Sequence, residues 1–124
     1  MKAIMYHYVR PFDKEYPNFK NLHIDDFKKQ LDYFEVEFGF VSKENFVNSF
    51  KTGTPSKGVI LTFDDGLFCH YDYVFQELKK RGLWGIFYVP TQPYVEGKLL
   101  DVHRTHLLLG KHESAKVFEF LEKK

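Results

Sequence analysis

Two adjacent carboxylates, Asp64 and Asp65, close the stretch VILTFDDG, which runs from Val59 to Gly66. Like charges at this spacing repel each other, and each is costly to bury without a partner. Either a cation compensates them or they face water. Neighbouring side chains at a strand end point to opposite sides, so one carboxylate could bind a metal while the other acts as a base. The alternative is a turn in which one carboxylate caps the following helix and the other is solvated.

A pair of histidines forms the second candidate group. His103 and His106 stand three apart in LLDVHRTHLLLG. On a helix this spacing puts both on one face, so both rings could reach one metal ion. Zinc is commonly held by His and carboxylate ligands, with one position left open for water. We therefore expect Asp65, His103 and His106 to be candidate ligands of a divalent metal, zinc in the first instance.

Two further histidines lie close to the motif or to a predicted strand end. His7, in MYHYV, is expected at the end of the first strand. It could orient Asp64, touch a substrate, or be a buried imidazole with satisfied hydrogen bonds. His70 follows Asp65 by about one helical turn, and we expect it on the helix surface or at the rim of the site rather than as a ligand.

Apolar runs and apolar periodicity define the elements that must position these groups. Apolar runs predict strands over 3–9, 40–41, 58–63 and 83–89. Apolar residues three or four apart predict helices over 25–38, 42–50, 71–78, 99–109 and 114–121. Ser42 is expected to cap the second helix, and Gly39 and Gly82 are expected to end helices in a left-handed conformation. The segment with Pro93 and Gly97 is predicted to be a loop.

The order of these elements predicts the fold class. Apolar strands alternating with amphipathic helices indicate an α/β protein with a parallel sheet covered on both faces. Right-handed crossovers place all strand C-termini on one side of such a sheet. We therefore expect His7, Asp64, Asp65 and Pro90 to converge on one rim, where α/β proteins carry their chemistry.

Composition narrows the class of protein. Hydrophobic residues make up 44% of 124 residues, which is enough for a packed core, and we expect a single domain over 1–124. The 19% of aromatic residues fill a core or, alternatively, line a groove for sugars. The net charge is +1 without a basic block, so nothing favours a nucleic-acid or anionic membrane partner. Cys69 is the single cysteine, which excludes internal disulfides. No signal peptide or membrane span is recognised, so we expect a cytoplasmic protein.

Three segments together resemble the polysaccharide deacetylase family of carbohydrate esterases. They are IMYHYV, LTFDDG and YDYVFQELKKRGLWGIFYV, and the resemblance runs from Met1 to about Val89. It implies a deformed parallel β/α barrel with a divalent metal at the strand C-termini, of the chitooligosaccharide deacetylase kind. It also implies hydrolysis of an N-acetyl group, sometimes an O-acetyl or formyl group, on a carbohydrate substrate.

The resemblance also assigns roles to individual residues. Asp64 matches the catalytic base of the family, and Asp65 matches its metal-binding aspartate. The family's chemistry is attack of an activated water on the amide carbonyl, with a backbone N–H near the motif helping to hold the oxyanion. Residues beside the motifs are expected to bind substrate: His7, Tyr8, Gly66 and His70.

The chain departs from the family at the second metal motif, where the family has two histidines four apart. Here the spacing is three. If His106 takes the second position, Val102 falls on the first. If His103 takes the first position, Leu107 falls on the second. Either the helix repositions both rings, or one ligand is lost.

Length is the second departure, because a closed β/α barrel needs about 200–250 residues. With 124 residues, the chain matches only the N-terminal half of the family. A half barrel leaves an open sheet edge and an apolar wall, so we expect self-association or a partner that completes the barrel, unless the chain is truncated. Two functions follow: a metal-dependent deacetylase, or a catalytically impaired relative that serves as a carbohydrate-binding or assembly module. A phosphohydrolase is disfavoured because no phosphate-binding glycine loop is present.

Overall fold

The computed structural model describes residues 1–123, and the chain divides into two compact units. The first unit comprises Met1–Arg10 and Leu22–Val89. The second comprises Pro11–Asn21 and Pro90–Lys124. The first unit holds the Asp-Asp motif, and the second holds the His103–His106 pair.

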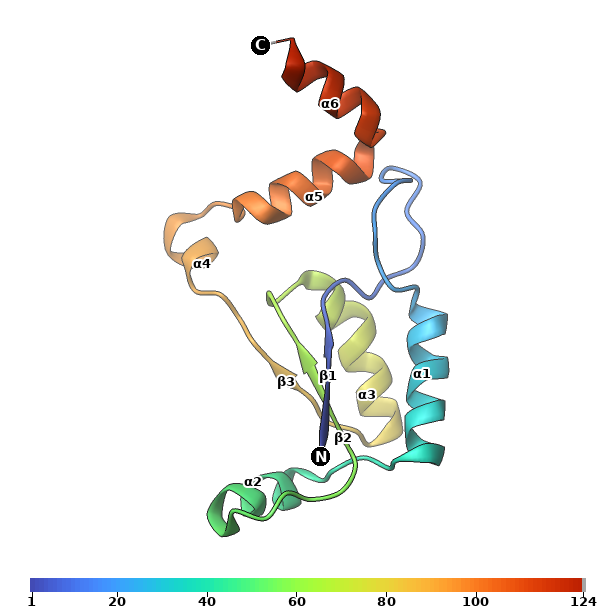
Figure 1. Cartoon of the computed structure of the whole chain (residues 1–124), viewed down its shortest axis with the longest axis vertical. Helices are drawn as coiled ribbons and strands as arrows, with labels where there is room; N and C mark the ends of the chain where they lie inside the picture. The colour runs from blue at the N-terminus through green and yellow to red at the C-terminus, as the bar shows by residue number, and fades with distance from the viewer. Residues whose placement is uncertain (124) are drawn as a thin grey trace. The chain divides into compact units, whose positions relative to one another are not determined.

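A three-stranded parallel sheet forms the centre of the first unit (Figure 1). Its strands are β1 (Lys2–Tyr6), β2 (Val59–Phe63) and β3 (Ile86–Phe87), in the order β1-β2-β3. β1 and β2 pair along their full length, from Lys2 opposite Val59 to Tyr6 opposite Phe63. The sheet is open, with β1 and β3 at its edges. The predicted fold class, a parallel β/α sheet forming part of a barrel, is therefore confirmed.

Two of the predicted strands are shorter in the structure. β1 ends at Tyr6 instead of Val9, and Val9 forms only an isolated bridge with Leu22. Phe40 likewise contributes an isolated bridge to Val59 instead of a strand. In both cases the chain turns away after one pairing, so no ladder can form.

The third strand is much shorter than predicted, covering two residues of the segment 83–89. Leu83 belongs to the end of the preceding helix, because its backbone N–H donates to the carbonyl of Leu78 at 2.9 Å. Trp84 turns its indole N–H to the carbonyl of Val41 at 2.7 Å. The first residues of this apolar run therefore end a helix and contact Val41, and only the later residues pair in the sheet.

Four helical segments accompany this sheet. They are α1 (Ile24–Glu37), α2 (Lys43–Thr52), the π-helical η1 (His70–Phe75) and α3 (Gln76–Arg81), which continues directly from η1. Ser42 caps α2 as predicted, because its Oγ accepts from the backbone N–H of Asn45 at 3.1 Å. Gly39 and Gly82 have φ of 66° and 65°, so both left-handed helix ends are confirmed.

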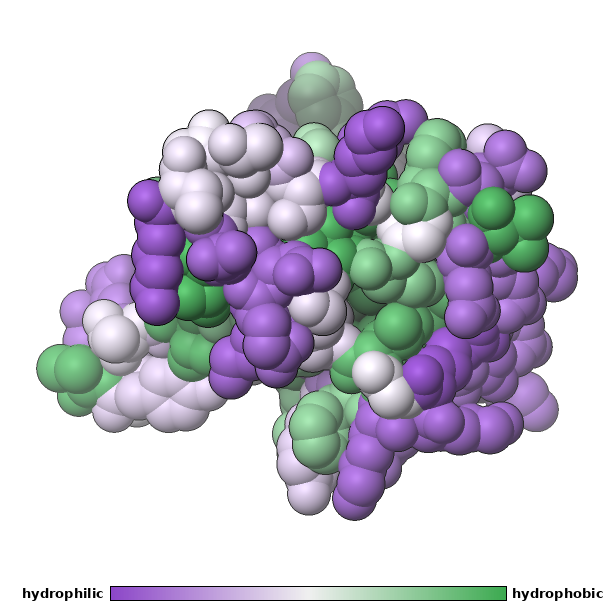
Figure 2. Space-filling model, turned by 90° about the horizontal axis from the view of Figure 1, so that it is seen from below, coloured by the Kyte–Doolittle hydropathy of each residue, from purple (hydrophilic) through white to green (hydrophobic). Residues whose placement is uncertain are grey.

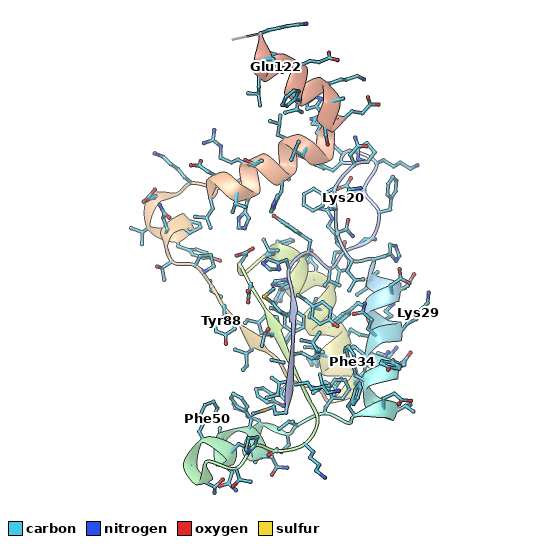
Figure 3. The ribbon with its side chains drawn as sticks, in the orientation of Figure 1. Lys20, Lys29, Phe34, Phe50, Tyr88 and Glu122 are labelled. Atoms are coloured by element: carbon cyan, nitrogen blue, oxygen red, sulfur yellow. The ribbon has the colours of Figure 1, made fainter. Side chains whose placement is uncertain are left out.

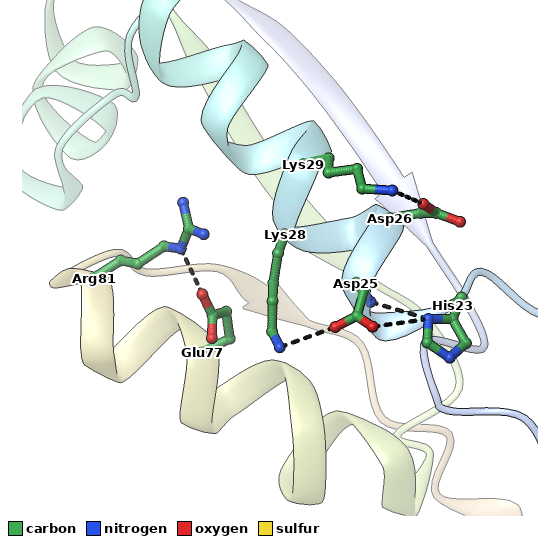
Figure 4. Close-up of polar contacts among 7 residues, drawn as sticks. All are labelled: His23, Asp25, Asp26, Lys28, Lys29, Glu77 and Arg81. Atoms are coloured by element: carbon green, nitrogen blue, oxygen red, sulfur yellow. Dashed lines mark hydrogen bonds and ion pairs between the residues drawn. The ribbon is translucent and has the colours of Figure 1, made fainter.

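Polar side chains fix the start of α1 and the end of α3 (Figure 4). His23 caps α1, since its Nδ1 accepts from the backbone N–H of Asp25 at 3.2 Å. Arg81 pairs with Glu77 one turn earlier at 2.6 Å and reaches Asp32 of α1. The Arg81–Asp32 ion pair connects α3 to α1, whereas the Arg81–Glu77 pair lies within α3.

The core lies between the sheet and the helices α1 and α3, which Figure 1 shows on the same side of the sheet. Phe27 and Leu31 of α1 are fully buried there, and Phe34 packs against them from the next turn (Figure 3). Tyr6 meets Phe27 edge to face at 5.1 Å between ring centroids. The predicted apolar stripe of α1 is therefore the face that the sheet covers.

The opposite face of the sheet is more open than expected. Met5 lies on this face, and its side chain is 59% exposed. Phe50 of α2 and Tyr88 after β3, both labelled in Figure 3, are also exposed. Figure 2 shows apolar side chains at the surface among charged ones. The expected cover on both faces is thus incomplete within the first unit.

The second unit consists of three helices and the loop Pro11–Asn21. The helices are α4 (Gln92–Glu96), α5 (Asp101–Lys111) and α6 (Ser114–Glu122). α4 forms where a loop was predicted, because Pro93 lies in its first turn, where no backbone donor is needed. The loop packs on α5: Asn18 donates to the carbonyl of Gly110 at 2.9 Å. Among residues 1–123, no helix is both long and apolar enough to cross a membrane.

Candidate active site

The Asp-Asp motif begins where β2 leaves the sheet. The backbone N–H of Asp64 donates to the carbonyl of Tyr6 at 3.0 Å, and Tyr88 donates to the carbonyl of Phe63 at 2.8 Å. These two bonds extend the sheet just beyond β1, β2 and β3. His7, Asp64 and Asp65 therefore follow neighbouring strand ends, as predicted. Pro90, the fourth residue expected there, belongs to the second unit.

Asp65 has an unusual backbone conformation. Its φ is 77°, and it is the one non-glycine residue among residues 1–123 with a positive φ. Gly66 follows with a φ of 56°, so two successive left-handed residues turn the chain immediately after β2. A left-handed non-glycine residue costs about 1–3 kcal/mol, although Asp tolerates it better than most. Such strain is concentrated at functional sites, which supports this turn as the centre of the candidate site.

Gly66 is required at its position for a second reason. A Cβ atom added there would lie 3.0 Å from Cγ1 of Val89, tighter than ordinary van der Waals contact. The chain after β3 therefore passes directly over the turn. The glycine of TFDDG is explained by both its conformation and this close approach.

His7 and Asp65 face each other across this edge of the sheet. Nε2 of His7 lies 3.8 Å from Oδ2 of Asp65, and the two side chains are 44% and 28% exposed. Because both remain in contact with water, their mutual attraction contributes little to stability. Their importance is that a carboxylate and an imidazole meet at an accessible point beside the turn.

Tyr8, the next residue along the chain, lies within the electrostatic field of Asp65. Its pKa is raised to about 12, first by burial and then by the negative charge of Asp65. The phenol therefore stays protonated at neutral pH. A protonated phenol can donate a hydrogen bond, which suits the expected role of Tyr8 in substrate binding.

His70 is buried instead of lying on the helix surface as expected. Its side chain is 2% exposed, and its ring packs against Phe63 and Phe87 with centroids 5.5 and 6.0 Å away. Its Nε2 lies 2.5 Å from the backbone carbonyl oxygen of His7. Burial lowers the pKa of His70, which favours the neutral ring. The predicted apolar stripe began at Tyr71 and left residue 70 out, although His70 lies four residues before Val74 and therefore on the same helical face.

A shallow apolar hollow of about 240 Å³ adjoins the turn. It lies between η1 and the segment that includes β3. Its lining residues are Gly66, Leu67, His70, Tyr71, Phe75, Phe87 and Val89. Aromatic side chains therefore lie beside the motif as well as in the core, in line with the groove-lining alternative raised by the composition.

The two histidines of the second unit lie on α5 in different environments. His103 is 7% exposed, whereas His106 is exposed. Three residues of separation on a helix therefore did not give the two rings equal access to a ligand. Within either unit, residues 1–123 include no group of three His, Cys, Asp or Glu side chains that could hold a metal ion. The carboxylates suit zinc chemically, but within the described residues of either unit they do not form an assembled ligand set.

Comparison with known proteins finds structural similarity only. No protein-family model and no curated protein matches the chain. The chain is similar to the structure of a de-N-acetylase from Aggregatibacter actinomycetemcomitans, with a TM-score of 0.54 and 22% identity. It is also similar to the Streptococcus pyogenes deacetylase PplD in complex with acetate, with a TM-score of 0.61 and 24% identity.

The similarity covers more of this chain than of either deacetylase. It spans 69% of this chain and 36% of the de-N-acetylase, and 89% of this chain and 52% of PplD. The chain thus spans about half or less of the structures that it matches. At these identities the similarity concerns the fold. The chain shares its fold with part of two deacetylase structures, in line with the fold that the resemblance of its N-terminal motifs implies.

Proposed function

We propose that the chain is part or all of a hydrolase that removes an N-acetyl group, or an O-acetyl group, from a sugar or polysaccharide. One observation carries the proposal. The TFDDG motif is intact and forms a strained turn at the C-terminal end of β2, in a fold that two deacetylases share. Chemistry at this end of a parallel sheet is the rule for α/β enzymes.

The proposal assigns separate roles to the two carboxylates. Asp64 is the general base, which takes a proton from the attacking water onto its carboxylate. Asp65 is a ligand of a divalent cation, zinc in the first instance, with His103 and His106 as the further candidates. Such a cation, when bound, makes water easier to deprotonate and stabilises negative charge on oxygen. The position of Asp65 beside the exposed ring of His7 supports its role, because both side chains are accessible.

Substrate binding is proposed for the groups around the turn. His7 is exposed enough to touch a sugar directly, and Tyr8 offers a protonated hydroxyl. Gly66 is included because it lines the hollow of about 240 Å³ beside the turn. The side chain of His70 is only 2% exposed and offers almost no surface to a substrate.

Acetate release from N-acetylated chitooligosaccharides tests the proposal. The purified chain is incubated with and without zinc, and released acetate is measured enzymatically. We expect zinc-dependent release that falls at least about 100-fold in Asp64→Asn, since a general base contributes this much. Asp72→Asn is the matched control, because Asp72 is an exposed carboxylate on η1 and should leave the rate unchanged. Equal rates for Asp64→Asn and the wild type would refute the role of Asp64.

A catalytically impaired carbohydrate-binding or assembly module is the second candidate function. It is favoured by the open sheet and by the lack, within either unit and among residues 1–123, of a three-ligand group. This candidate predicts glycan binding by calorimetry without acetate release at any zinc concentration. It also predicts self-association by light scattering, because the apolar side chains exposed on the sheet would then be covered.

A further inference from the structure

The two nitrogens of the buried His70 ring have different surroundings. Nε2 lies 2.5 Å from the carbonyl oxygen of His7. Nδ1 is buried and has no hydrogen-bond partner among residues 1–123. A carbonyl oxygen can only accept a hydrogen bond, so Nε2 must carry the hydrogen. In the neutral ring Nδ1 then holds a lone pair, and the tautomer is fixed by the bond to His7.

Packing alone does not explain a histidine at this position. The ring stands among Phe63 and Phe87, and a phenyl group would make the same aromatic contacts. A buried nitrogen without a partner destabilises the folded chain, and phenylalanine would avoid this cost. The one interaction that requires histidine here is therefore the bond to the His7 carbonyl.

This bond continues the backbone connections beyond the end of β1. The carbonyl of Tyr6 accepts the backbone N–H of Asp64, and the next carbonyl, that of His7, accepts the ring Nε2–H of His70. The backbone on both sides of the His7 Cα atom is thereby held to the β2–η1 segment. The His7 ring then lies 3.8 Å from Asp65, which is itself fixed in a left-handed conformation.

We propose that His70 is a positioning residue, which holds the His7 backbone through its Nε2–H bond and so keeps the His7 ring against Asp65. It touches neither a substrate nor a reacting atom. The effect of His70 on hydrolysis rests on the proposed function, whereas its effect on the position of the His7 ring does not.

Nuclear magnetic resonance on the wild-type chain tests the tautomer without any substitution. Imidazole nitrogen shifts and couplings identify the protonated nitrogen of His70. We expect the Nε2–H form with a coupling to the His7 carbonyl carbon. An Nδ1–H form would overturn the proposal.

Two substitutions separate positioning from packing. His70→Phe keeps the ring and removes the donor, whereas His70→Gln keeps a donor near the position of Nε2. We expect His70→Phe to shift the His7 ring resonances and the Asp65 amide, and His70→Gln to shift them less. Val74→Ala is the control, since Val74 is fully buried in the same segment and should lower stability without moving His7. Unchanged His7 resonances in His70→Phe, or equal shifts in Val74→Ala, would overturn the proposal.

Acetate release gives the functional measurement. In His70→Phe the turnover number should fall about 10-fold or more, with partial recovery in His70→Gln, because small displacements of catalytic groups are costly. If the wild-type chain releases no acetate, the proposed function fails, and the resonance measurements still decide the role of His70. If His70→Phe is as active as the wild type, the proposal fails while the proposed function stands.

Discussion

The strand end that carries Asp65 and the helix that carries His103 and His106 position their side chains in different ways. Asp65 is held by its own backbone, in a left-handed turn beyond the last bonds of the sheet. On α5 the backbone is regular, and the two rings differ in burial because of what packs around the helix. A short motif can specify the first arrangement locally. Helical spacing alone cannot specify the second.

Because the backbone fixes Asp65 more firmly than α5 fixes its histidines, we predict that zinc binding depends more on Asp65 than on His103 or His106. Asp65→Ala should weaken zinc binding by more than about 100-fold in calorimetry, because it removes the proposed carboxylate ligand. His106→Ala should weaken it less, since the spacing of three departs from the expected ligand pattern. If the Asp65→Ala variant binds zinc like the wild type and the His106→Ala variant does not bind zinc, the metal site lies on α5 instead.

The glycine of the turn gives the next largest effect, on the free energy of unfolding. Gly66→Ala should cost about 2 kcal/mol or more, because it adds a left-handed side chain that also meets Val89. Gly97→Ala is the matched control in the second unit. Gly97 has a φ of 63° and nothing within 4 Å of the added atom, so the cost should be about 1 kcal/mol. Urea unfolding measures the loss of stability in both variants. Equal losses would show that the contact between Gly66 and Val89 adds no constraint.

His103 and His106 should contribute differently to the stability of the folded chain. His103→Ala should lower the free energy of unfolding by more than about 1 kcal/mol, because a buried side chain is removed. His106→Ala should change it by less than about 0.5 kcal/mol, since the residue is exposed. Thermal unfolding of the metal-free chain checks this difference. A larger cost at His106 would contradict the burial of the two rings.

The smallest expected effect is a pH dependence of stability caused by His70. Burial lowers the pKa of His70 in the folded chain below the ordinary value of 6.5. The unfolded chain therefore binds the proton first, and stability should fall as the pH drops below 6.5 toward the folded-state pKa. Urea unfolding from pH 7.5 to 5 should show this fall, and His70→Phe should reduce its slope. An unchanged slope in that variant would assign the dependence to other groups.

The features that the sequence predicted correctly have local causes. Ser42 caps α2 through its own side chain, and Gly39 and Gly82 end helices by their own conformations. β2 was predicted within one residue, because every residue of its apolar run belongs to the strand and none to a neighbouring helix or turn. The resemblance to deacetylases likewise rested on contiguous motifs in the first unit.

The features that were missed depend on contacts between distant residues. β3 shrank because Leu83 and Trp84 bond to Leu78 and Val41. His70 was missed because the predicted stripe began at Tyr71, and its ring is buried against Phe63 and Phe87, which lie far from it in the sequence or on another element. The positive φ of Asp65 is a local feature that was also missed. Asp is enriched in this conformation among non-glycine residues, but most aspartates are right-handed or extended, so residue type alone did not predict it.

The proposed role of Asp64, at the end of β2, is that of the base in a hydrolytic centre. This role is tested by measuring acetate released from an N-acetylated chitooligosaccharide in ¹⁸O-labelled water, with zinc present. We expect acetate with one ¹⁸O atom from the wild-type chain and from Asp72→Asn, and at least about 100-fold less from Asp64→Asn. Labelled acetate from Asp64→Asn at the wild-type rate, or none from the wild-type chain, would contradict it.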